Sequence, residues 1–355
     1  ILDLDNLEEI KKIDQGNFIS LLANFPNQLE EALGNSQEKI AKLNLQGEFK
    51  NIVCCGMGGS ALFGDFLKSC LRDEISLPIE VCRGYHLPKF IDKDSLVLVD
   101  SYSGDTAESL SAFGEAKERG CQIVCFTSNG KLKEMAETSG TNLVLLPTGL
   151  TPRQSFHYSV IYSLALLNKL GLISDKSGEI MEAINITKKQ VIKYSSDVKI
   201  AENSAKTLAQ KIFGKISIIY TASDYKIAAL KWKIDFNETA KTIAFYNVFS
   251  ELNHNEINGW EHPKELTKNF IVIYLRNDDD PERIKKRFDI TKKIINPYVA
   301  EIIEIYSGGE GKLTRLFSSI LLGSFISFYL AILNKTDPTP ALKVEFLKRE
   351  LGNNY

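Results

Sequence analysis

Two short loops in this sequence combine glycines with hydroxyl side chains, a composition that suits the binding of a small anion. In the first, GMGGSA at residues 56–61, the glycines let the backbone approach an anion closely. Ser60 begins the helical pattern that follows, where free N–H groups and the positive end of the helix dipole meet. In the second, SYSGDT at residues 101–106, the serine and threonine hydroxyls surround Gly104. We therefore predict one phosphate site that needs no metal, built by Gly58, Gly59, Ser60, Ser101, Ser103 and Thr106.

Three alternative interpretations of these loops, as a dinucleotide site, a nucleoside triphosphate site or a simple helix cap, do not account for all of their residues. The first loop satisfies the letters of the dinucleotide fingerprint G-x-G-x-x-A, but that fingerprint also needs an acidic residue about 20 positions later. The second strand-like run ends instead in Cys-Arg-Gly at residues 82–84. A nucleoside triphosphate loop needs Lys-Ser/Thr after its glycines, and none follows here. Capping of the next helix would explain Thr106 alone, but not Ser101 and Ser103 beside a glycine-rich loop.

The loops must be positioned by the elements around them, and these alternate. Strand-like runs rich in Val, Ile and Leu are separated by helical patterns from residue 49 to residue 170, and the alternation restarts at residue 215 after a Lys-rich helical segment at residues 174–211. Such alternation indicates parallel sheets covered on both faces. We predict an α/β fold with two doubly wound parallel-sheet domains of flavodoxin-like or Rossmann-like build, and helical segments at both ends of the chain. The predicted domains are residues 1–173 and residues 174–355.

The bulk properties exclude several classes of partner. A chain of 355 residues suggests two domains at about 150 residues each. The net charge of −2, without a basic tail, argues against a nucleic-acid partner. The apolar run at residues 316–333 contains serines and a glycine, so we expect a buried core helix and no membrane span. The sequence starts without a secretory signal pattern, and its six cysteines form no CxxC pair, which favours reduced thiols in a cytoplasmic protein and no zinc cluster.

The two loops resemble those of the sugar isomerase (SIS) superfamily of phosphosugar-binding domains. Three further segments narrow the resemblance: LTPRQSFHYS at residues 150–159, NETAK followed by NHNE within residues 235–261, and DPTPALKVEFLKREL at residues 337–351. In this order they are similar to the bifunctional phosphoglucose/phosphomannose isomerase family, which has two SIS domains. The resemblance covers about residues 51–351. Most SIS relatives carry Asn where this chain has Asp105, so we expect that carboxylate to point away from the phosphate.

The resemblance implies an aldose–ketose isomerase that interconverts glucose 6-phosphate and mannose 6-phosphate with fructose 6-phosphate through a cis-enediol, without cofactor or metal. Glu238 matches the base that moves the proton between C1 and C2, and His254 matches the residue that opens the sugar ring. Arg153 would neutralise the enediolate oxygen. Lys343 and Lys348 compete for a catalytic role near the C-terminus, and the family's pattern of a Lys shortly before the final Leu implies Lys348.

Two further features come from the same resemblance. Thr339 matches a small polar residue of the sugar pocket. The family also implies a homodimer in which His254 is contributed to the active site by the neighbouring subunit.

Other functions remain open on the sequence. An aminosugar-phosphate isomerase would use similar loops, whereas a glutamine-dependent synthase would need a cysteine nucleophile near the N-terminus, and residues 1–50 contain none. A non-catalytic sugar-phosphate sensor would carry a basic DNA-binding domain before its SIS domain. Here the stretch before Asn51 is acidic, and we expect one or two helices in it. The presence of both Glu238 and His254 favours an enzyme.

Overall fold

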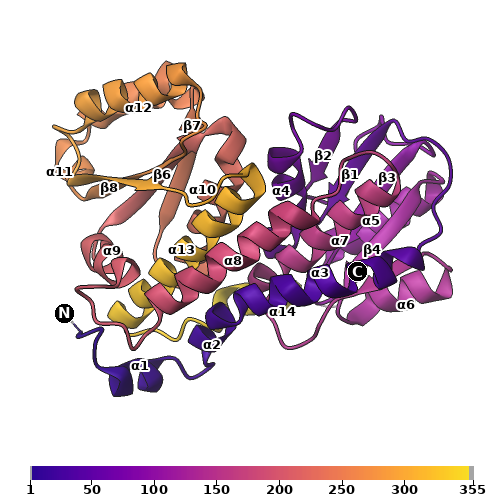
Figure 1. Ribbon diagram of the computed structural model, residues 1–355, viewed down its shortest axis with the longest axis horizontal. Helices are drawn as coiled ribbons and strands as arrows, with labels where there is room; N and C mark the ends of the chain where they lie inside the picture. Colours follow the sequence, from indigo (N-terminus) through magenta and orange to yellow (C-terminus); the bar gives the residue numbers. More distant parts are fainter. Residues whose placement is uncertain (1, 352–355) are drawn as a thin grey trace. The chain divides into compact units, whose positions relative to one another are not determined.

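Two parallel β-sheets form the framework of the protein. The computed structural model describes residues 2–351, which form one compact unit of residues 27–181 and a second unit of residues 2–26 together with residues 182–351 (Figure 1). These bounds differ from the predicted division into residues 1–173 and 174–355, which stays a prediction. Both sheets are parallel throughout, which confirms the predicted α/β fold class.

The unit of residues 27–181 contains five strands in the order β2-β1-β3-β4-β5. The strands are β1 (Asn51–Cys55), β2 (Ile79–Cys82), β3 (Ser95–Asp100), β4 (Gln122–Thr127) and β5 (Asn142–Leu145). The helices are α3 (Phe25–Ala41), of which residues 27–41 belong to this unit, α4 (Leu62–Cys70), α5 (Ala107–Glu118), α6 (Gly130–Thr138) and α7 (Phe156–Lys169). Every residue of β1 and β3 is buried, because helices cover both faces of the sheet at its centre.

The unit that holds residues 182–351 has four strands in the order β7-β6-β8-β9. They are β6 (Ile216–Ala222), β7 (Ala244–Phe249), β8 (Phe270–Arg276) and β9 (Glu301–Tyr306). The helices are α1 (Leu7–Ile13), α2 (Phe18–Ala23), α8 (Ser177–Tyr194), of which residues 182–194 belong to this unit, α9 (Ser204–Ile212), α10 (Lys226–Glu238), α11 (Lys264–Thr267), α12 (Glu282–Ile295), α13 (Lys312–Leu333) and α14 (Leu342–Leu351).

The two faces of this second sheet are covered by different elements. On one face α9, α10 and α13 pack together, and the indole of Trp232 on α10 donates to the carbonyl of Ser319 on α13 at 2.8 Å. On the other face lie α12 and the short helices η4 (Glu251–His254) and η5 (Glu256–Glu261). Their side chains join Phe249 and Tyr274 in one aromatic core. Figure 1 shows α12 across β6 and β8 from α9 and α13.

Helix α13 contains the apolar run at residues 316–333, for which a membrane span was considered from the sequence. It is long and apolar enough to cross one, but its most apolar stretch of 18 residues is completely buried within the protein. The prediction of a core helix is therefore confirmed for this segment.

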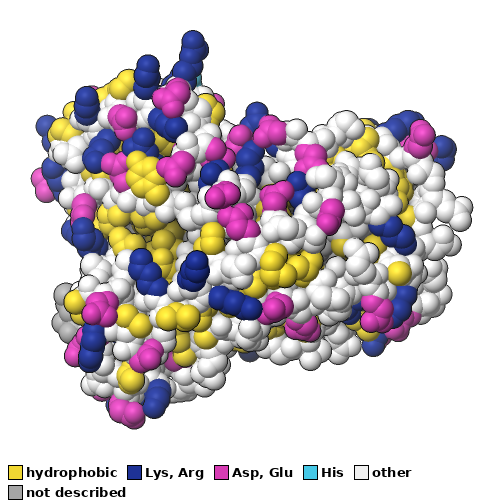
Figure 2. Space-filling view, in the orientation of Figure 1, with side chains coloured by type: hydrophobic (Ala, Val, Ile, Leu, Met, Phe, Trp, Pro, Cys, Tyr) yellow, Lys and Arg dark blue, Asp and Glu magenta, His cyan; other side chains and the backbone are white. Residues whose placement is uncertain are grey.

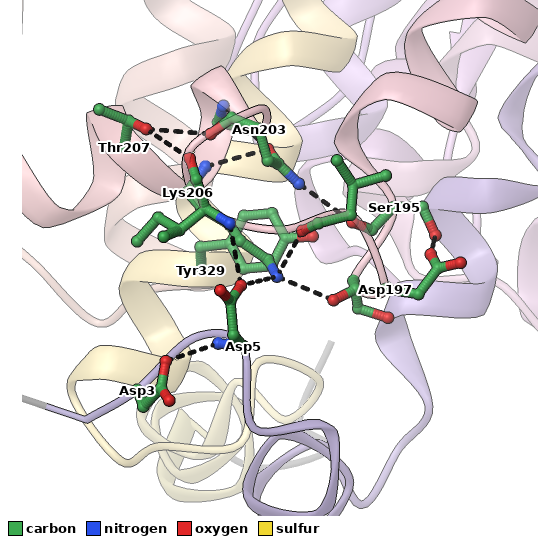
Figure 3. Close-up of polar contacts among 12 residues, drawn as sticks. Asp3, Asp5, Ser195, Asp197, Asn203, Lys206, Thr207 and Tyr329 are labelled. Carbon is green, nitrogen blue, oxygen red and sulfur yellow. Dashed lines mark hydrogen bonds and ion pairs between the residues drawn. The ribbon is translucent and has the colours of Figure 1, made fainter.

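The N-terminal segment is anchored to the second unit by a buried lysine. Lys206 on α9 is fully buried, and its ammonium group donates to Asp5 Oδ1 at 3.0 Å and to the carbonyls of Ser196 and Val198 at 2.8 Å each (Figure 3). Asn203 begins α9 by accepting from the main-chain N–H groups of its first turn. Because of this cap, the predicted helical segment at residues 174–211 is divided into α8 and α9.

The stretch before Asn51 also differs from expectation. It contains three helices, α1, α2 and α3, where one or two were predicted. The reason is a buried aspartate in the turn after α1. The carboxylate of Asp14 accepts from the N–H groups of Phe18 at 2.7 Å and Ile19 at 3.0 Å, so that a separate short helix starts at Phe18.

Candidate functional site

The two hydroxyl-rich loops meet at one point of the first sheet. They follow β1 and β3, which are neighbours, and the strand order reverses between these two strands. In open α/β sheets, ligands bind at the carboxyl edge at such a switch point. The main-chain N–H of Tyr102 in the second loop donates to the Ser60 hydroxyl of the first at 3.1 Å. The structure therefore brings the two predicted phosphate loops into contact.

The first loop is packed tightly enough to require glycine. Gly58 has a φ of +51°, and Gly58–Ala61 form a short helix η1 that leads into α4. A Cβ on Gly59 would lie 2.5 Å from the main-chain nitrogen of Arg153, so the loop can hold no side chain there. Arg153 belongs to η2 (Pro152–Gln154) and is 2% exposed. The predicted residue Arg153 thus lies against the predicted glycine loop.

The second loop curls around its glycine. Gly104 has a φ of +78°, its N–H donates to the carbonyl of Ser101 at 2.9 Å, and a Cβ on it would lie 1.8 Å from the carbonyl oxygen of Asn129. Ser101 is buried and Ser103 is exposed. Thr106 occupies the N-cap position of α5, but its hydroxyl makes no capping hydrogen bond. Capping therefore does not account for this threonine.

Asp105 is turned toward the next helix. Its Oδ1 accepts from the main-chain N–H of Lys131, in the first turn of α6, at 3.0 Å. A negative charge is stabilised at a helix N-terminus. This contact gives the carboxylate a structural function within the second loop.

Asp100 is a polar residue of this edge that sequence reasoning missed. It is the last residue of β3, directly before Ser101, and it is 1% exposed. Its Oδ2 accepts from the hydroxyl of Ser159 on α7. Burial raises the pKa of Asp100 to about 7, and the nearby Ser159 and Ser60 hydroxyls oppose this rise. The signal in the sequence is an acid directly after the apolar run LVLV of this strand.

In the second unit, one lysine connects the end of α10 to the segment that precedes Thr339. Glu238 is the last residue of α10 and is half-buried. Lys241, which has a φ of +53°, donates from Nζ to the carbonyl of Glu238 at 2.8 Å. The same group donates to the carbonyls of Asp337 at 2.9 Å and Pro338 at 3.2 Å. The structure thus brings the Glu238 end of α10 to the segment that carries Thr339. Lys241 belongs to the NETAK motif, but the motif alone suggested no role for it.

Thr339 is also in contact with the N-terminal segment. Its N–H donates to Asp337 Oδ1 at 2.9 Å. A Cβ on Gly16, in the turn between α1 and α2, would lie only 2.0 Å from Thr339 Oγ1. Burial raises the pKa of Asp14 in the same turn, and the charge of Asp337 adds to the effect. Gly16 is a second residue beside the predicted site that its sequence context did not identify.

His254 is exposed on the opposite face of the sheet from α10. It ends η4, and its neighbour Asn253 is fixed to α12 by a bond to Thr291 at 2.8 Å and one from Arg287 at 3.1 Å. The sheet therefore separates His254 from the helix that ends in Glu238. Within one chain the structure does not bring these two residues together.

The C-terminal lysines lie on a helix without buried residues. Lys343 and Lys348 are both exposed on α14, together with its apolar side chains. Leu342 and Leu347, for example, are 67% and 57% exposed. The structure thus gives the two lysines similar surroundings.

The corresponding edge of the second sheet is unsuited to an anion. Its switch point lies between β6 and β8, and the loop after β8 carries three consecutive aspartates at residues 278–280. Asp279 is paired with Arg315 at 2.6 Å and accepts from the Tyr225 hydroxyl at 2.8 Å. Across the face shown in Figure 2, basic and acidic side chains are interspersed. Within residues 2–351, no group of three or more His, Cys, Asp or Glu side chains is placed to hold a metal ion.

Comparisons with known proteins show the family to which the chain belongs. Residues 201–351 match the family model of the bacterial phospho-glucose isomerase C-terminal SIS domain. A bifunctional phosphoglucose/phosphomannose isomerase from Caldicellulosiruptor bescii is 40% identical over 331 residues, which cover 93% of this chain and 97% of that protein. A protein of the same name from Aquifex aeolicus is 35% identical over 347 residues, covering 97% and 99% of the two chains.

The fold is also found among solved structures. The crystal structure of a glucose-6-phosphate isomerase-like protein from Thermus thermophilus matches with a TM-score of 0.64 at 15% identity. The match covers 99% of this chain and 100% of that one. At this level of identity, the likeness shows the fold alone.

Proposed function

Because the chain belongs to the bifunctional phosphoglucose/phosphomannose isomerase family, we propose that it is an aldose–ketose isomerase for hexose 6-phosphates. It interconverts glucose 6-phosphate and mannose 6-phosphate with fructose 6-phosphate by proton transfer through a cis-enediol, without metal or cofactor. The observation that carries the proposal is the contact between the two hydroxyl-rich loops at the switch point of the first sheet, made by Tyr102 and Ser60.

The phosphate of the sugar is held by these loops. Hydroxyls at the start of α5 and main-chain N–H groups of a glycine-rich turn can bind a dianion without a metal. The close packing of Gly59 supports this assignment, because the loop backbone, and no side chain, is available there. The residues assigned to the phosphate are Gly58, Gly59, Ser60, Ser101, Ser103 and Thr106.

The chemical step is assigned to residues of three types. Glu238 moves the proton between C1 and C2, and its half-buried position suits a carboxylate that acts as a base. Arg153 neutralises the enediolate oxygen, since a guanidinium keeps its charge at all physiological pH values. His254 opens the sugar ring, because imidazole exchanges protons near neutral pH. Lys348 is assigned as a further catalytic residue, and Thr339 is assigned to the sugar pocket.

The position of His254 supports a homodimer. Helix α10 has 13 residues, is about 20 Å long and ends at Glu238. It covers one face of the sheet, whereas His254 lies on the other face. An active site that uses both residues therefore takes them from different chains. The six cysteines of the chain are all free thiols, which supports a location in the reducing cytoplasm. The proposed partners are a small sugar phosphate and a second copy of the chain, with neither nucleic acid nor membrane.

A coupled assay with glucose, mannose and glucosamine 6-phosphates tests the function, run without added metal and again with EDTA. We expect conversion of the first two to fructose 6-phosphate, unchanged by the chelator. Turnover of glucosamine 6-phosphate alone would establish the aminosugar alternative. Binding of all three without turnover would establish a sensor. Activity abolished by EDTA would show a metal-dependent hydride shift and would remove the assigned role of Glu238.

A further inference from the structure

Asp100 is the residue directly before the second phosphate loop, and the proposed mechanism assigns it no role. Its Oδ2 accepts from the hydroxyl of Ser159, whereas its Oδ1 is fully buried and accepts no hydrogen bond. The Ser60 hydroxyl lies near this carboxyl group and opposes the rise of its pKa. An unsatisfied buried carboxylate oxygen is costly, so its position beside a binding loop needs an explanation.

The hydrogen-bonding capacity of Ser60 can explain why this carboxyl group lies beside the binding loop. A serine hydroxyl has one proton to donate and two lone pairs that accept. The N–H of Tyr102 occupies one lone pair, at 3.1 Å. If Asp100 is ionised, the Ser60 proton is drawn to the carboxylate. If Asp100 is protonated, its O–H can donate to the second lone pair of Ser60, and the Ser60 proton is then available to a phosphate oxygen.

We propose that Asp100 is a positioning residue that must carry a proton for Ser60 to donate to the substrate phosphate, so that binding takes up a proton from solvent. The proton adds to a carboxylate oxygen of Asp100, and no bond of the substrate changes. This inference rests on the proposed function, because it assumes that the loops bind the phosphate.

The electrostatics of the site favour this arrangement. The raised pKa of Asp100, about 7, means that both protonation states are present near neutral pH, and a bound dianion favours the neutral one. The shift comes from burial, opposed by the Ser159 and Ser60 hydroxyls. The elements packed around it carry further ionisable groups, among them Cys54 and Cys55 on β1, Asp65 on α4, Glu108 on α5, Cys125 on β4, Tyr102 in the second loop, Arg153 in η2, and His157 and Tyr158 on α7.

Calorimetry of fructose 6-phosphate binding at pH 7.5, in two buffers of different ionisation enthalpy, counts the protons exchanged. We expect the wild-type protein to take up most of one proton. Asp100→Asn should bind with little or no uptake, because the amide N–H donates to Ser60 at every pH. Asp280→Asn is the matched control. Asp280 is also a buried aspartate, with its pKa raised to about 6, but it follows β8 in the other unit, so its loss should leave the uptake unchanged.

The pH profile of KM is an independent readout. The wild-type KM should rise above pH 7, by up to about tenfold per pH unit, while the KM of Asp100→Asn stays flat and kcat changes little in either protein. Binding without proton uptake by the wild-type protein would overturn the proposal, whether or not the variant folds. Equal uptake by Asp100→Asn would overturn it as well. No binding of fructose 6-phosphate at all would overturn the proposed function together with this inference.

Discussion

Glu238 and Ser103 have different tasks in the proposed reaction, and kinetics can separate them. A base acts on the transition state, so its loss lowers kcat, whereas phosphate contacts are made in the ground state and the transition state alike. Both side chains are at least partly exposed, so that neither replacement should disturb the core.

For Glu238→Gln we expect kcat toward glucose 6-phosphate to fall by about 10²- to 10⁴-fold, the usual contribution of a general base, with KM nearly unchanged. Steady-state kinetics in the coupled assay measures this. Glu261→Gln, at an exposed position of η5 in the same unit, is the control and should have wild-type rates. A variant that keeps more than about a tenth of its kcat would exclude Glu238 as the base.

For Ser103→Ala we expect a rise in KM of about 10- to 100-fold with little change in kcat, because one hydrogen bond to a charged phosphate is lost. Ser139→Ala removes a comparable exposed hydroxyl, which donates to the carbonyl of Met135 on α6, and should leave KM unchanged. A loss confined to kcat would contradict the phosphate-binding role of Ser103.

Among the elements, the turn between α1 and α2 is far in sequence from the predicted sugar pocket but contacts a segment assigned to it. It packs against the segment of Thr339, and Lys241 holds that segment to the end of α10. The N-terminal helices are anchored separately by the ion pair of Asp5 with Lys206 (Figure 3). This turn thus supports one wall of the predicted sugar pocket.

Gly16→Ala should therefore lower kcat/KM and the melting temperature together, since the added methyl group would overlap the side chain of Thr339. Gly34→Ala on α3 is the matched control. Its Cβ would meet nothing within 4 Å, and alanine in a helix is more favourable by about 1 kcal/mol, so stability should rise. Thermal unfolding and the coupled assay measure both effects. Wild-type kcat/KM in Gly16→Ala would show that the turn does not position Thr339.

For the molecule as a whole, the main question is which chain supplies each catalytic residue. Twice the chain mass of 39.8 kDa is about 80 kDa, the mass that light scattering should give for the proposed homodimer. A mass of about 40 kDa with full activity would contradict the dimer.

Mixed dimers test the origin of the residues directly. If each active site combines Glu238 of one chain with His254 of the other, co-expression of Glu238→Gln and His254→Ala chains creates one intact site in every mixed dimer. Random pairing makes half of the dimers mixed, so about a quarter of wild-type activity should return. The chain carrying both substitutions, co-expressed with wild type, is the control for assembly. Activity no higher than that of the separate variants would place both residues in one chain.

Local patterns were sufficient to predict the strands, most helices and the positions of the two loops. Val- and Ile-rich runs that alternate with amphipathic segments predict parallel sheets, because such strands are buried on both faces. In a parallel sheet every loop after a strand opens at the same edge, so Ser60 and Ser101 could be expected to be neighbours before any contact was known.

Other features depend on contacts between residues far apart in the chain, and these carry no local signature. Asp100 beside Ser60 and Ser159, Gly16 against Thr339, and the cap at Asn203 that divides a continuous helical pattern all arise from packing. The placement of Glu238 and His254 on opposite faces follows from the crossover of the chain over the sheet. Periodicity reports which residues are buried, but not which partners bury them, and that pairing is settled only when the elements pack.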